Sequence, residues 1–218
     1  GKDQSYVLYN LTQHQLAHTI FPLGAYSKTQ IREMAEKQNF CNARKHDSQD
    51  ICFVPDGDYV GFMEQYTGKR YPSGDFIDEN GKKIGTHAGA VRYTIGQRRG
   101  LGLPMGDRVY VCAKDMEKNT VTVGPVESLF ATRVIVRDMN WISVPELTGE
   151  MRVKAKLRYR QKEQPAVASP LDGGRILLTF DEPQRGPAIG QAAVLYDGDT
   201  VVGGGTICGV PKDEEVCR

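Results

Sequence analysis

Several features that define common protein classes are missing from this sequence of 218 residues. It contains no run of about 18 apolar residues, so we expect no membrane-spanning helix. The first residues, Gly1 to Gln4, show neither the apolar core nor the cleavage site of a signal peptide, which favours a cytoplasmic protein. The formal net charge is only +1, so any basic surface for an anionic partner has to be local.

Cysteine pairs of the C-x-x-C type are also absent, which argues against a thiol redox protein. The number of cysteines is odd, and this fits free thiols in a reducing compartment better than a disulfide framework. The five are Cys41, Cys52, Cys112, Cys208 and Cys217.

Metal and nucleotide sites lack their usual patterns as well. Cys41, His46 and Cys52 match no familiar zinc spacing, and the stretch from His14 to His18 has a glutamine where the H-E-x-x-H motif needs its general-base glutamate. We therefore expect no metal site. The run Gly203–Gly205 is not followed by Lys and Ser or Thr, so we interpret it as close backbone packing and find no nucleotide-binding loop in the sequence.

The elements that are present begin with helix-start signals. Thr12 with Gln15, and Ser27 with Gln30, match the capping box, in which a hydroxyl and an amide satisfy each other's backbone donors. Helical spacing of apolar residues then predicts a short helix from about Lys28 to Gln38 and another that begins near Asp58.

After Tyr71 the pattern changes to short strands separated by turns, as 24 glycines and 11 prolines suggest. Asn80-Gly81 predicts a hairpin, and Val109–Val111 is expected to pair with Val121–Val123. The predicted fold class is mainly β with a few helices (α+β): a short helical N-terminal stub, a mixed central module and a C-terminal antiparallel β-barrel. The barrel strands are expected at Arg133–Arg137, Met151–Gln161, Ala166–Ser169, Ile176–Phe180, Ala192–Tyr196 and Val201–Gly205.

The segment Met151–Arg160 alternates apolar and basic residues. In a strand this alternation predicts one apolar face and one face of five cations, Arg152, Lys154, Lys156, Arg158 and Arg160. Five like charges on one face repel each other unless an anion lies against them, so the pattern favours a nucleic-acid backbone. The alternative is a solvated face neutralised by acidic residues of adjacent strands.

Cys52 lies where a polar stretch, His46–Asp50, meets an apolar run. A nearby cation such as Lys45 could favour the reactive thiolate of such a cysteine. The alternative is a small, buried apolar cysteine.

Several blocks in this order closely resemble those of the bacterial and organellar tRNA-specific 2-thiouridylases, from Gly1 to about Ile207. The blocks are Lys2–Tyr6, Asp47–Phe53, Gly85–Gly89, Tyr93–Gly102, Arg158–Gln161, Phe180–Pro183 and Gly190–Ala192.

The resemblance implies ATP-dependent transfer of sulfur to C2 of the wobble uridine in tRNAs for Lys, Glu and Gln. It implies that Cys52 carries a persulfide received from a sulfur-relay protein. It also implies that tRNA is contacted by Lys2, Asp3, Gln4, Arg158, Tyr159 and Gln191. The family's ATP-binding loop and first catalytic cysteine are not in this sequence, so we expect a fragment that is inactive alone.

The resemblance further implies that residues 1–55 are the end of a catalytic domain that carries the persulfide cysteine. Residues 56–127 are expected to form a central module, 128–207 a tRNA-binding β-barrel and 208–218 a tail. A different reading remains open, in which the chain is a stand-alone RNA-binding module of β-barrel type and Cys52 is structural.

Overall fold

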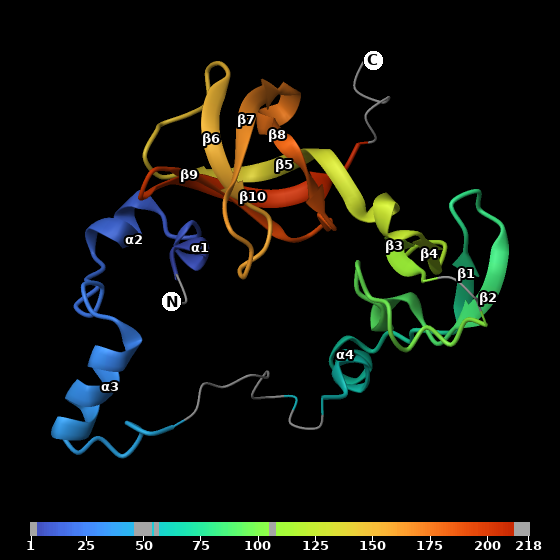
Figure 1. Ribbon diagram of the computed structural model, residues 1–218, viewed down its shortest axis with the longest axis horizontal. Coiled ribbons are helices and arrows are strands. Elements are labelled where there is room, and N and C mark those ends of the chain that lie inside the picture. Colours follow the sequence, from blue (N-terminus) through green and yellow to red (C-terminus); the bar gives the residue numbers. More distant parts are fainter. Residues whose placement is uncertain (1–3, 46–53, 55–56, 105–107, 212–218) are drawn as a thin grey trace. The chain divides into compact units, whose positions relative to one another are not determined.

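The computed structural model describes residues 4–45, 54, 57–104 and 108–211 (Figure 1). The chain divides into two compact units. The first contains Leu11–Lys69, and the second contains Gln4–Asn10 together with Arg70 onwards. Strands outnumber helices, and a closed antiparallel barrel forms the C-terminal part, so the predicted α+β class is confirmed.

The described residues of the first unit include the short helices α2 (Gln13–Ala17), α3 (Lys28–Lys37) and α4 (Tyr59–Thr67). Both predicted capping boxes are present, with Thr12 and Ser27 as the N-caps of α2 and α3. The carboxylate of Asp58 accepts a hydrogen bond from the Gly61 N–H at 3.0 Å and starts α4. None of the helices in the described residues is long and apolar enough to cross a membrane.

The second unit begins with α1 (Ser5–Leu8) and continues into a sheet with the strand order β2-β1-β4-β3. Its strands are β1 (Gly74–Ile77), β2 (Lys83–His87), β3 (Tyr110–Asp115) and β4 (Thr120–Gly124), with the 3-10 helix η1 (Ala90–Arg92) after β2. The predicted hairpin at Asn80-Gly81 joins β1 to β2, and Val111 pairs with Val123 as predicted. The strands β1 and β4 pair in parallel.

The side chain of His87 is buried in the core of this sheet and is 2% exposed. Its ring lies edge-on to Phe76, and its Nδ1 accepts a hydrogen bond from the Gly89 N–H at 3.0 Å. Within the described residues, Nε2 has no hydrogen-bond partner. Burial is the main cause that lowers the pKa of His87 below 6.5, so the imidazole is neutral at pH 7.

The barrel is closed in the order β10-β5-β8-β7-β6-β9, and every pair in it is antiparallel. Its strands are β5 (Phe130–Trp141), β6 (Met151–Lys156), β7 (Gln164–Leu171), β8 (Arg175–Arg185), β9 (Ala192–Asp197) and β10 (Thr200–Gly209), with 3-10 helices η2 (Val126–Leu129) and η3 (Asp172–Gly174). Inward-facing side chains such as Val136, Leu157 and Leu178 fill it. All six predicted strands are present, but β6 ends at Lys156 and not at Gln161.

The glycines Gly203–Gly205 of β10 confirm the expectation of close packing. A Cβ on Gly204 would lie 2.7 Å from the ring of Tyr9, and one on Gly203 or Gly205 would lie 2.6 or 2.5 Å from a carbonyl oxygen of β5. The glycine run thus lets β10 approach both β5 and the N-terminal segment Gln4–Asn10.

Candidate functional site

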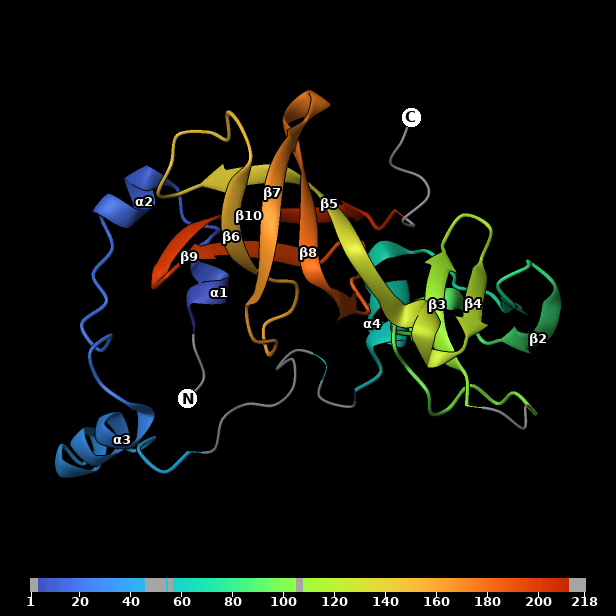
Figure 2. The same cartoon turned by 45° about the horizontal axis from the view of Figure 1, so that its top comes forward.

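The N-terminal segment Gln4–Asn10 is bound to the barrel. The Tyr6 hydroxyl donates a hydrogen bond to the Ala192 carbonyl at 2.9 Å, and the Ser5 hydroxyl lies 3.3 Å from that of Tyr196 on β9. The Asn140 side chain of β5 donates to the Tyr9 carbonyl. Figures 1 and 2 both draw α1 beside β9. Gln4 is the N-cap residue of α1 and is exposed, so docking of α1 holds a predicted tRNA contact next to the barrel.

Tyr6 connects this segment to Tyr159. The two rings meet edge to face with their centroids 6.0 Å apart. Burial raises the pKa of Tyr6 to about 12, with further increases from Tyr9 and Tyr196 and an opposing effect of Arg158. The Tyr6 hydroxyl therefore keeps its proton and remains a hydrogen-bond donor.

Arg158 and Tyr159 lie in a tight turn that follows β6. The Gln161 side chain accepts a hydrogen bond from the Leu157 N–H at 3.2 Å and donates to Gln184 at 2.7 Å, which fixes the turn. The Arg158 guanidinium donates through Nη2 to the Gly186 carbonyl. Its Nε is buried and has no hydrogen-bond partner among the residues that the structure describes.

The predicted face of five cations on residues 151–160 is wrong. Alternation holds only as far as Ala155, because the strand ends at Lys156. Lys156 is buried, with its Nζ 4.8 Å from the ring centre of Tyr196. The Arg158 side chain is half-buried, so it does not belong to an exposed face of cations either.

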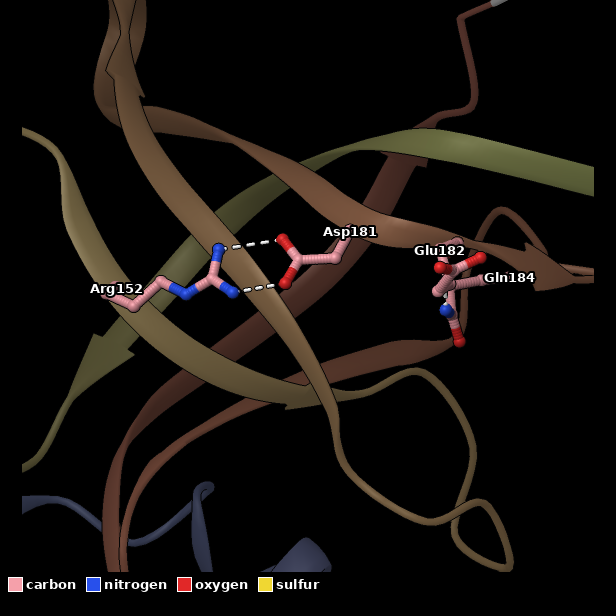
Figure 3. Close-up of polar contacts among 4 residues, drawn as sticks. All are labelled: Arg152, Asp181, Glu182 and Gln184. Atoms are coloured by element: carbon pink, nitrogen blue, oxygen red, sulfur yellow. Dashed lines mark hydrogen bonds and ion pairs between the residues drawn. The ribbon is translucent and has the colours of Figure 1, made fainter.

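The two cations that do face outward from β6 are paired with acidic residues. Arg152 reaches across β7 and makes a bidentate ion pair with Asp181 of β8 (Figure 3). The pair raises the pKa of Arg152 and lowers that of Asp181, mainly through the hydrogen bonds between them. The Nζ of Lys154 lies 3.7 Å from Oε1 of Glu163, within the distance of an ion pair. Acidic residues thus neutralise these two cations, as the alternative reading expected, but not from adjacent strands. Asp181 lies on β8, one strand beyond the adjacent β7, and Glu163 lies in the loop before β7.

Gln191 lies at the end of the turn between β8 and β9. The Gly190 N–H donates to the Ile207 carbonyl, and the Ile207 N–H donates back to the Gln191 carbonyl, both at 2.8 Å. These bonds tie the turn to β10 and leave the Gln191 side chain exposed. Gln191 is next to Ala192, the residue that accepts the Tyr6 hydrogen bond.

The structure thus brings four predicted tRNA contacts to segments that meet around Tyr6: Gln4, Arg158, Tyr159 and Gln191. The other predicted site residues, Lys2, Asp3 and Cys52, lie outside the described residues. Sequence reasoning missed Tyr6 itself. The residue is part of the block Lys2–Tyr6, but nothing in its local pattern indicates a contact 186 positions away.

The thiols that are described differ in their surroundings. Cys41 is exposed. Burial raises the pKa of Cys112, whose Sγ lies 3.2 Å from the Tyr110 carbonyl. Cys208 contacts the Ile135 carbonyl at 3.5 Å. Within residues 4–45, 54, 57–104 and 108–211, no three His, Cys, Asp or Glu side chains are grouped to hold a metal ion.

Three domain models of one family match the chain in order. A tRNA methyl transferase HUP domain matches residues 1–56, a tRNA methyl transferase PRC-barrel domain matches 60–125, and an aminomethyltransferase β-barrel domain matches 131–207. A HUP domain, a PRC-barrel domain and a β-barrel domain in this order place the chain in the class of tRNA-modifying proteins that these models describe.

The relatives give the family. The chain is 50% identical over 207 residues to the tRNA-specific 2-thiouridylase MnmA 1 of Thermoanaerobacter sp. (strain X514). The matched region covers 95% of this chain and 57% of that protein. It is 49% identical over 209 residues to the tRNA-specific 2-thiouridylase MnmA of Heliobacterium modesticaldum, covering 95% of this chain and 54% of the relative. The chain belongs to the tRNA-specific 2-thiouridylase family, and it spans somewhat more than half the length of these relatives.

Proposed function

We propose that the protein transfers sulfur to C2 of the wobble uridine of tRNAs for Lys, Glu and Gln, and that the segments around Tyr6 contact the tRNA. The names of the relatives support tRNA thiolation. The observation that carries the tRNA contact is the meeting of α1, the turn Leu157–Gln161 and the turn before β9. Residues from three distant parts of the chain are thereby presented together.

Arg158 supports this assignment. Its Nε is buried and has no partner in the part of the chain that the structure describes, and such an atom lowers stability unless something compensates for it. Uncompensated polar atoms are rare in folded proteins, and each calls for an explanation. The proposal offers one: the half-buried side chain, anchored at Gly186, is retained for its positive charge, which favours a tRNA phosphate.

Cys52 is proposed to carry the sulfur as a persulfide delivered by a sulfur-relay protein. The terminal sulfur forms a bond to C2 of the uridine, and the C2–O bond breaks as the adenylated oxygen departs with AMP. A thiolate from a second cysteine then attacks Sγ of Cys52. The S–S bond of the persulfide breaks, its electron pair stays with the transferred sulfur, and Cys52 is left in a disulfide with the second cysteine. An external thiol then reduces this disulfide before the next turnover.

ATP is proposed as the co-substrate that turns the oxygen at C2 into a leaving group. The N-termini of the described helices α2, α3 and α4 do not fit ATP phosphates. Side chains of Thr12, Ser27 and Asp58 already cap the N-termini of α2, α3 and α4, and Asp58 adds a negative charge. We therefore assign ATP to residues outside this chain and expect these 218 residues alone to lack the complete activity.

The division of labour along the chain is part of the proposal. Residues 1–55 belong to the sulfur-transfer domain, 56–127 form a central module and 128–207 form the tRNA-binding barrel, with a tail at 208–218.

Competition between the thiols tests the role of Cys52. With limiting iodoacetamide we expect Cys52 to react fastest, because sulfur transfer requires a thiolate. Cys112 should react slowest, since burial raises the pKa of its thiol. Mass spectrometry of the five cysteine peptides measures the order. Faster labelling of Cys41 or Cys112 than of Cys52 would contradict the assignment.

A further inference from the structure

Tyr6 lies between the two proposed tRNA-contacting turns of the barrel. Its ring packs against Tyr159 of the first turn, and its hydroxyl is bound to Ala192, next to Gln191 of the second. Tyr6 is half-buried and retains its proton, so the hydroxyl is a permanent donor. One side chain therefore touches the first turn and the residue that directly follows the second.

The Tyr159 ring meets Tyr6 in an edge-to-face contact that can set its orientation. The turn that carries Tyr159 is fixed in its backbone by Gln161, and Arg158 is fixed separately at Gly186. Among the described residues, the only ring contact recorded for Tyr159 is that with Tyr6. An edge-to-face pair has a preferred geometry, so removing one ring frees the other to rotate.

We propose that Tyr6 is a positioning residue for tRNA binding, which orients the Tyr159 ring and holds Gln191 near it. This inference rests on the proposed function. Tyr6 acts through its neighbours, because its hydroxyl is already engaged by Ala192 and its ring by Tyr159. A preset Tyr159 ring avoids the entropy that ordering a side chain costs upon binding.

The test uses the affinity of the full chain for an unmodified lysine tRNA transcript at several salt concentrations. Tyr6→Ala should weaken binding roughly 2- to 10-fold, the range of an aromatic pair. The dependence of affinity on salt should not change, because no cation is removed. Tyr6→Phe keeps the ring and should restore most of the affinity. The control is Tyr26→Ala, since Tyr26 is 49% exposed and lies in the first unit.

A double-mutant cycle separates positioning from general stability. If Tyr6 acts through Tyr159, Tyr6→Ala should have little further effect in a chain that already carries Tyr159→Ala. An equal loss in both backgrounds would overturn the inference. Circular dichroism melting checks that each variant is folded, and Tyr6→Leu, which keeps the bulk of the side chain, replaces Tyr6→Ala if the latter unfolds.

The failure of this inference differs from the failure of the proposed function. If Arg158→Ala and Tyr159→Ala weaken tRNA binding but no Tyr6 variant does, the positioning role is wrong and the interface stands. If the chain does not bind the transcript, or Arg158→Ala and Tyr159→Ala bind it as tightly as the original chain, the interface itself is wrong and Tyr6 has nothing to position.

Discussion

Two adjacent residues, Leu157 and Arg158, are expected to contribute to stability to different extents. Leu157 is 1% exposed and part of the barrel core, so Leu157→Ala should lower the free energy of unfolding by about 2–5 kcal/mol. Arg158→Ala removes the charged hydrogen bond to Gly186 and should lower it by roughly 1 kcal/mol. Urea unfolding measures both.

The same pair separates folding from tRNA binding. Arg158→Ala should weaken tRNA binding about equally across tRNA sequences and reduce the salt slope by roughly one phosphate contact. Leu157→Ala should leave the dependence of tRNA affinity on salt unchanged under conditions in which the variant is folded. An Arg158→Ala variant with unchanged affinity and slope would remove Arg158 from the interface.

His87 predicts a pH dependence of stability. Its pKa is lowered in the folded protein, so between 6.5 and that lower value the unfolded chain binds more protons than the folded one. Stability should therefore fall as pH drops below about 6.5, by up to roughly 1.4 kcal/mol per pH unit. His87→Gln should remove this slope, whereas His14→Gln, at an exposed position, should retain it. Urea unfolding between pH 7.5 and 5.5 makes the comparison.

At the scale of elements, β10 and the N-terminal segment are fitted to each other at Gly204. A Cβ there would lie 2.7 Å from the Tyr9 ring and 2.9 Å from the Ala193 carbonyl oxygen. Gly204→Ala should lower stability by about 1–3 kcal/mol through overpacking. It should also weaken tRNA binding by displacing the segment that carries Gln4.

Gly149→Ala is the matched control, because a Cβ at this exposed position meets no atom within 4 Å. Melting temperatures and tRNA affinities of the two variants provide the measurement. Equal behaviour of the two would show that the close approach at Gly204 is not needed.

The elements show what a sequence can and cannot predict. The capping boxes at Thr12 and Ser27, the hairpin at Asn80-Gly81 and the six barrel strands depend on local patterns, and the structure confirms them. The predicted end of β6 is wrong, because the alternation of residues 151–160 continues beyond the strand, which stops at Lys156. Ion pairs such as Arg152 with Asp181 depend on which strands are neighbours, and the pattern of one strand does not contain that information.

At the scale of the whole molecule, the chain should not bind ATP measurably. The N-termini of α2, α3 and α4 are capped by side chains, and the sequence has no Gly-rich phosphate loop. Isothermal calorimetry should give no specific heat with ATP but a clear signal with a tRNA transcript. Specific micromolar ATP binding would contradict the assignment of ATP to residues outside this chain.

The contact of α1 with β9 also sets an order of events during synthesis. Tyr6 bonds to a residue 186 positions later, and Ser5 to one 191 positions later. A ribosome that adds about 5–20 residues per second needs roughly 10–40 s to make that partner. For this time Gln4–Asn10 has no barrel on which to dock. The first helix of the chain is therefore among the last to reach its native place, and the proposed tRNA surface is completed only when translation of the barrel ends.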